Sequence, residues 1–203
     1  MKVILYVLLS FVLAWKSFAQ SNKKEINKSI HFCVEKNSKI YTLSSFNVYD
    51  YCIAIEQILV ENNLLLKNDK KSYYNLLLDI AKSKKDDRFF KIYEKINQKL
   101  YHSDVLMNPG VFSTVFVCFS NVMEEFEIDE RFGDFKENID TLMERPVYND
   151  FSLNKKMIFS VPEREVSNIT FKAPIIAVLY SNLYYYNEAK GENNKWLLNF
   201  EIE

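Results

Sequence analysis

The sequence predicts a mainly α-helical fold: a single multi-helix domain with a small β element, such as a hairpin, in its C-terminal quarter. Glycine is scarce, with three among 203 residues, and an all-β domain needs many tight turns that glycine usually supplies. Apolar residues recur at steps of three and four in segment after segment, which is the period of an amphipathic helix. Asn or Asp precedes several of these segments, where its side chain can cap a helix.

Residues 1–19 have the pattern of an export signal. Lys2 supplies a positive charge, and the apolar run from Val3 to Trp15 ends at Lys16. Because a membrane-spanning helix needs about 20 apolar residues, this run is too short to cross a bilayer. Small residues at Ser17 and Ala19 fit a cleavage site. We predict a signal peptide cleaved after Ala19, with an uncleaved anchor or a buried helix as alternatives, and a single helical domain over residues 20–203.

Four helices are expected in the first half of that domain. The first helix lies within residues 22–37 and has its apolar residues on one face. The second is capped by Asn47 and ends near residues 61–63. The third follows a cap at Asp69, and the fourth follows a cap at Asp86 or Asp87. Their expected buried faces are, in order: Ile26, Ile30, Cys33 and Val34; Val48, Tyr51, Cys52, Ile55, Ile58 and Leu59; Tyr73, Leu76, Leu77 and Ile80; Phe89, Ile92, Tyr93, Ile96 and Leu100.

The middle of the chain is harder to assign. Asn108 and Pro109 form a good helix start, and the aromatic residues after them keep helical spacing. Residues 115–119 are nevertheless rich in β-branched and aromatic side chains, which is typical of a strand. We predict a helix here, and a further helix around Phe135 and Ile139 that stops before Pro146.

The β element is expected in the last fifty residues. Residues 147–161 suggest irregular chain with a short strand, and a hairpin about Asn154. Residues 160–163 match a capping box, with Glu163 three residues after Ser160. Pro174 near a start and Gly191 past an end suggest a final helix. The competing interpretation is a hairpin that turns at residues 190–195.

The charge balance bears on the class of partner. Without residues 1–19 the chain has 24 basic and 27 acidic side chains, a net charge of −3. Binding to nucleic acid requires Lys and Arg clustered on one face, whereas the lysine-rich stretches of this chain alternate with acids or Asn. We therefore expect no nucleic-acid partner, and no transmembrane helix after the leader.

Metal and thiol chemistry are not predicted. The chain has two histidines and three cysteines, in none of the spacings typical of zinc ligands, so we expect neither a metal nor a cofactor. The cysteines appear on apolar faces, and an exported protein can oxidise a pair of them. Three pairings are open; Cys33–Cys52 is favoured because neighbouring antiparallel helices would bring those two positions together.

Carboxylates are the remaining source of catalysis. Serine-hydrolase and phosphate-loop motifs do not occur in the sequence. Two paired carboxylates can hydrolyse a glycosidic bond when burial keeps one of them protonated. An exposed acidic helix end is the simpler interpretation, so no catalytic residue is predicted. The acidic residues concerned are Glu124, Glu125, Glu127, Asp129, Glu130 and Asp134.

A tyrosine cluster is the candidate binding surface. One helix stripe or one strand face cannot bury four rings within seven residues, so part of the cluster should be exposed or lie under a partner. Tyrosine is common at protein interfaces because its ring is apolar and its hydroxyl polar. The residues predicted to contact a partner are Tyr180, Tyr184, Tyr185 and Tyr186.

Together these features favour an exported, non-enzymatic binding protein of the cell envelope, in the periplasm or outside the cell. It would act as an accessory subunit or as an inhibitor- or immunity-type partner, with another protein as the binding target. The alternatives are a small carboxylate-dependent hydrolase of glycans and a carrier of an apolar ligand held among aromatic helices.

The export signal gives the first testable prediction. Mass spectrometry of the protein from the envelope fraction of the producing cells should find a chain that begins at Gln20. A chain that begins at Met1 would contradict cleavage after Ala19.

Overall fold

The computed structural model describes residues 24–38, 47–100, 112–126, 132–145 and 148–189, and these are almost entirely helical. The prediction of a mainly helical fold is therefore confirmed, whereas the described residues contain no strand. A first helix includes residues 24–38. It is followed by α2 (Val48–Glu61), α3 (Lys70–Lys82), α4 (Asp87–Leu100), α5 (Ser113–Glu125), α6 (Gly133–Glu144), α7 (Phe151–Ser160), a short 3₁₀ turn (Glu163–Glu165) and α8 (Ile169–Glu188).

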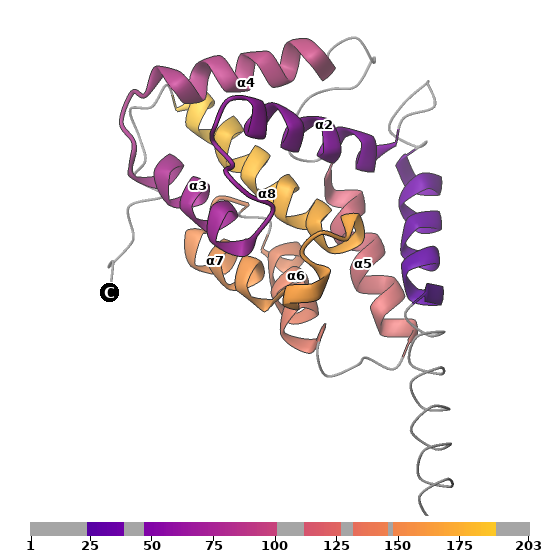
Figure 1. Ribbon diagram of the computed structural model, residues 1–203. Coiled ribbons are helices and arrows are strands. Elements are labelled where there is room, and N and C mark those ends of the chain that lie inside the picture. Colours follow the sequence, from indigo (N-terminus) through magenta and orange to yellow (C-terminus); the bar gives the residue numbers. More distant parts are fainter. Residues whose placement is uncertain (1–23, 39–46, 101–111, 127–131, 146–147, 190–203) are drawn as a thin grey trace, which may run out of the picture.

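Helix α8 is the centre of the fold. Every residue from 170 to 183 is buried, and the helix contacts α2, α3, α4, α5 and α7. Figure 1 shows it crossing the middle of the bundle, with α2 and α4 above it and α3 and α7 below. A helix that is apolar on all sides is stable only when neighbours surround it. The other helices therefore derive their positions largely from α8.

Aromatic rings pack closely between the helices. Phe119 of α5 lies with its ring centroid 5.0 Å from that of Phe135 on α6 and 5.5 Å from that of Phe171 on α8. Phe132 stacks on Phe171 at 4.9 Å. The high aromatic content of the sequence thus supplies ring-to-ring contacts that join three helices.

The predicted caps begin their helices. Asn47 Oδ1 accepts a hydrogen bond from the Tyr49 amide at 3.0 Å, and Asp69 Oδ1 accepts from Ser72 at 2.7 Å. Asp86, one of the two residues expected to cap the fourth helix, accepts from the Arg88 amide at 2.9 Å. Helix α5 confirms the helix rather than the strand over residues 115–119, and α6 ends before Pro146 as expected.

The hairpin predicted about Asn154 is wrong, because residues 151–160 form α7. Asp150 caps this helix by accepting from the Leu153 amide at 3.0 Å. Asn154 resembles a turn residue in the sequence, but its side chain is fully buried and donates to the Tyr148 carbonyl at 2.9 Å. A polar side chain on the inner face of a short helix concealed the helical period.

The start of α8 also differs from the prediction. Ser160 ends α7 rather than capping a helix, and Asn168 caps α8 by accepting from the Thr170 amide at 3.1 Å. Pro174 therefore lies inside the helix, not at its start. Because proline has no N–H, it cannot donate to the Thr170 carbonyl one turn earlier.

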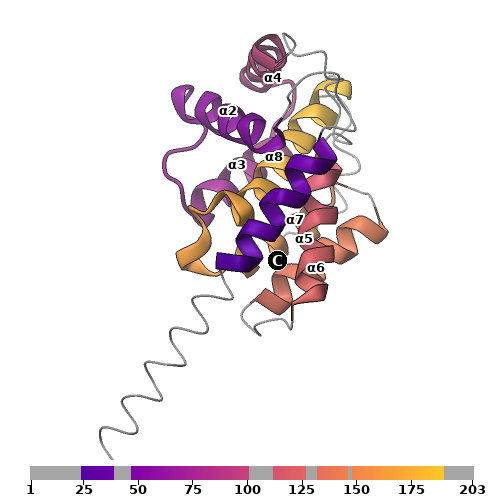
Figure 2. The same cartoon turned by 90° about the vertical axis from the view of Figure 1, so that its right-hand side faces the viewer.

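One disulfide joins Cys33 to Cys118, and the predicted Cys33–Cys52 pair is wrong. Helix 24–38 lies beside α5 (Figures 1 and 2), where the Cα atoms of Cys33 and Cys118 are 5.6 Å apart. Cys52 faces α8 instead, and its buried thiol donates to the Ala173 carbonyl at 3.8 Å. Helix 24–38 does contact α2, where His31 packs on Tyr49, but Cys52 lies on the face of α2 that packs against α8, and the prediction failed for that reason.

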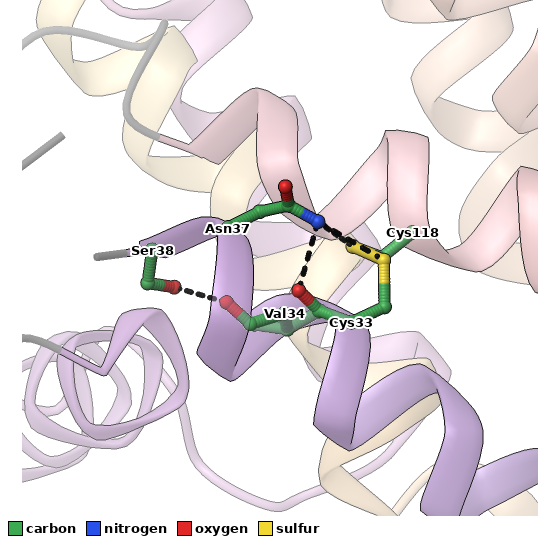
Figure 3. The surroundings of a disulfide bond; sticks show 5 residues. All are labelled: Cys33, Val34, Asn37, Ser38 and Cys118. Atoms are coloured by element: carbon green, nitrogen blue, oxygen red, sulfur yellow. Dashed lines mark hydrogen bonds between the residues drawn. A yellow bond between two sulfur atoms is a disulfide. The ribbon is translucent and has the colours of Figure 1, made fainter. Parts of the chain in front are cut away.

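An amide covers the disulfide. Asn37 Nδ2 lies 2.9 Å from the Cys33 carbonyl oxygen, 3.3 Å from Cys33 Sγ and 3.5 Å from Cys118 Sγ (Figure 3). The same helix is held to α8 by His31 Nε2, 3.1 Å from Thr170 Oγ1. Helix 24–38 is therefore fastened at two points along its length.

Several predictions lie outside the described residues: the leader at residues 1–19, the helix start at Asn108, and Gly191 with the hairpin at 190–195. Among the helices that are described, none has both the length and the apolar character needed to cross a bilayer.

Loss of the disulfide should destabilise the protein. A cross-link between residues 85 positions apart restricts the unfolded chain, which is worth about 4.5 kcal/mol in the chain-entropy treatment. We expect Cys33→Ser/Cys118→Ser to lower the free energy of unfolding by about that amount in urea titrations.

Cys52→Ala is the matched control, because it removes a buried thiol without opening the cross-link. Peptide mapping of the wild-type chain should find Cys33 linked to Cys118, and Cys52 alkylated only after unfolding. A peptide in which Cys52 is disulfide-linked would refute the pairing.

Candidate functional site

A group of polar side chains lies between α2, α3 and α8. Lys172 of α8 is 8% exposed, and its Nζ lies 2.5 Å from Glu56 Oε2 on α2. Tyr73 of α3 donates its hydroxyl proton to Glu56 Oε1 at 2.7 Å. The Asn68 side chain contacts the same hydroxyl. Both carboxylate oxygens of Glu56 are therefore occupied by partners within the chain.

Two groups beside Glu56 stay protonated at neutral pH. Burial raises the pKa of Tyr73, and the hydrogen bond to Glu56 raises it further. Burial, followed by the charge of Glu56, likewise raises the pKa of the Cys52 thiol, which lies one helical turn before Glu56. A phenol and a thiol that stay protonated serve neither as a base nor as a nucleophile. The arrangement is that of a structural ion pair.

A hollow of about 290 Å³ opens to the surface beside this cluster. Glu56 forms part of its wall but is already neutralised by Lys172. The described residues contain no group of three or more side chains able to hold a metal ion. The hollow is lined by Glu56, Gln57, Val60, Glu61 and Asn68.

Two of the four predicted partner-binding tyrosines are core residues, so that part of the prediction is wrong. Tyr180 is fully buried and donates to Asn97 Oδ1 at 3.2 Å. Tyr186 is also buried; its ring lies 5.3 Å from that of Phe89, and its hydroxyl oxygen accepts from the Asp86 amide at 2.6 Å. Helix α4 runs along this end of α8 and covers both rings.

Tyr184 and Tyr185 remain half-buried. Their rings meet edge to face at 5.3 Å, and the Tyr184 ring lies 6.2 Å from that of Tyr93 on α4. Burial raises the pKa of Tyr184, and the nearby Glu188 carboxylate raises it further. The Tyr184–Tyr185 pair forms the partly exposed remainder of the tyrosine cluster.

The acidic residues considered for glycan hydrolysis are not buried where the structure describes them. Glu124 and Glu125 lie exposed at the end of α5, and Asp134 lies exposed at the start of α6. Glu127, Asp129 and Glu130 fall outside the described residues. The exposed carboxylates among them therefore lie in solvent at the ends of helices.

His31 packs against its neighbours rather than facing a set of metal ligands. Its ring lies 4.5 Å from that of Tyr49, and partial burial lowers its pKa. His102 lies outside the described residues.

Sequence reasoning missed an aromatic surface between α3 and α7. The Tyr74 ring lies 5.9 Å from Phe151 and 5.4 Å from Phe159, measured between centroids. Lys155 Nζ lies 5.8 Å from the centre of the same ring. The i, i+4, i+8 spacing of Phe151, Lys155 and Phe159 was present in the sequence, but it has meaning only once residues 151–160 are known to be helical.

In comparisons with protein-family models, curated proteins and solved structures, the chain has no match. The function proposed below is therefore inferred from the geometry of the described residues.

The ion pair between Glu56 and Lys172 can be tested with a double-mutant cycle. Because removal of one partner leaves a charge in a buried place, Glu56→Gln should lower the free energy of unfolding by about 3 kcal/mol. Lys172→Met should have a similar effect, and the double variant should lose less than the sum of the two. Urea unfolding measures all four proteins. Additive losses would show that the two groups do not interact.

Proposed function

We propose that this chain is an exported, non-enzymatic binding protein of the cell envelope, an accessory subunit or an inhibitor- or immunity-type partner. It would bind another protein, in the periplasm or at the cell surface.

The disulfide supports export. Cys33 and Cys118 are oxidised, and such bonds persist in exported proteins but are rare where the cytosol keeps thiols reduced. The disulfide and the leader-like residues 1–19 are independent features, and both favour the same compartment.

The occupied state of the polar cluster supports a role without catalysis. Glu56 and Lys172 neutralise each other, and Tyr73 and Cys52 are held protonated. Each group satisfies another group of the chain, so the cluster is suited to fixing α2 and α3 on α8 rather than to acting on a substrate.

The observation that carries the binding role is the Tyr184–Tyr185 pair. These are the first half-exposed residues after the buried run from 170 to 183 of α8, so the rings stand on the most firmly held helix of the fold. Aromatic side chains on a rigid support lose little conformational freedom on binding, and such residues often dominate interface energies.

Replacement of both rings should impair binding without unfolding the chain. We expect Tyr184→Ala/Tyr185→Ala to keep its helical content by circular dichroism and to bind its partner at least tenfold more weakly, which corresponds to about 1.4 kcal/mol. The partner would first be captured by a photo-crosslinking amino acid at position 185 in the producing cells and identified by mass spectrometry.

In the matched control, the photo-crosslinking amino acid stands at position 32 instead of position 185. Phe32 is exposed on helix 24–38, away from the tyrosine pair. A protein cross-linked from position 185 but not from position 32 supports the proposal. Equal capture from both positions, or unchanged affinity of the double variant, would refute it.

A further inference from the structure

The α3–α7 face has a repeated pattern of charge and ring. On α3, Lys70 and Lys71 precede Tyr74 by four and three residues; on α7, Lys155 and Lys156 precede Phe159 by the same steps. Residues three and four apart lie together on a helix, so each ring has two ammonium groups one turn before it. We call Lys70, Lys71, Tyr74, Lys155, Lys156 and Phe159 the aromatic–lysine surface.

The two halves of this surface are in direct contact. The rings of Tyr74 and Phe159 lie 5.4 Å apart, and Lys155 Nζ lies 5.8 Å from the Tyr74 ring centre. Lys70 Nζ donates to the Phe159 carbonyl at 3.0 Å, which ties the start of α3 to the end of α7. The surface is therefore one continuous patch.

The patch is incompletely covered, and acids compensate its lysines only in part. Asp69 lies close enough to Lys71 for their charges to interact. Phe159 is 47% exposed although it touches Tyr74. Lys70 lies 3.5 Å from the exposed carboxylate of Glu163. In the part of the chain that the structure describes, Lys71, Lys155 and Lys156 form no ion pair.

We propose that the aromatic–lysine surface binds an acidic segment of another protein that carries a large apolar side chain. Carboxylates of the segment would meet the lysines, and its apolar side chain would cover Phe159. Complementary charge selects the partner and speeds the encounter, while a half-buried ring supplies apolar area at the centre. A polyanion without apolar groups would leave Phe159 uncovered. This inference is independent of the Tyr184–Tyr185 pair, because the two surfaces share no residue.

The test uses the disulfide-bonded chain and a fluorescent peptide of sequence EEFEELEE, with EESEESEE as the probe that lacks apolar side chains. Fluorescence anisotropy should show binding of the first peptide with a dissociation constant below about 1 mM, weakened by added salt. The serine peptide should bind at least tenfold more weakly. Phe159→Ser and the pair Lys155→Glu/Lys156→Glu should each weaken binding of the first peptide at least tenfold.

Matched variants test whether peptide binding depends on this surface rather than on exposed rings or lysines elsewhere in the protein. Phe32→Ser removes another exposed ring, and Lys91→Glu/Lys99→Glu reverses two exposed lysines of α4; both should change affinity less than twofold. The proposal is overturned if the first peptide does not bind, if the serine peptide binds equally well, or if the α4 pair weakens binding as much as the α7 pair. Phosphatidylglycerol vesicles that bind with the same dependence on Phe159 would assign the surface to a membrane instead.

Discussion

The burial of α8 on all sides is the constraint on which the rest of the structure depends. Helices α2, α3, α4, α5 and α7 pack against it, helix 24–38 contacts it through His31, and it can exist in water only because its neighbours cover it. Within its buried run, residues 170–183, the single charged side chain is Lys172. A lone ammonium in this place would be costly, so the carboxylate of Glu56 is needed to neutralise it. One ion pair therefore permits an otherwise apolar helix to carry a charge and fixes the register of α2 against α8.

Much of the helical architecture could be predicted because it depends on local chemistry. Caps such as Asn47 and Asp69 satisfy free amides within their own turn, and apolar stripes follow the helical period. The failures occurred where a buried polar residue interrupts a stripe. Asn154 conceals α7, and Lys172 obscures the first turns of α8. The amide nitrogen of Asn154 and the ammonium of Lys172 each pair with a group outside their own helix, which periodicity cannot reveal.

The candidate sites could likewise be predicted only in part, because they depend on tertiary packing. The crowding of four tyrosines correctly implied that some rings would remain at the surface, and Tyr184 and Tyr185 do so. Which rings these would be depended on the course of α4 along α8. The disulfide depended in the same way on helix 24–38 lying beside α5. The α3–α7 surface combines two short sequence patterns that only tertiary packing brings together.

The central helix is also a late one in the chain. Helices α2, α3 and α4 have α8 as a common neighbour, yet they emerge from the ribosome more than sixty residues before it. Until residues 169–188 are available, α2, α3 and α4 lack the helix that they share as a neighbour, and long-range contacts of this kind form late in folding. Their apolar faces should therefore stay incompletely buried in the nascent chain until α8 has been made.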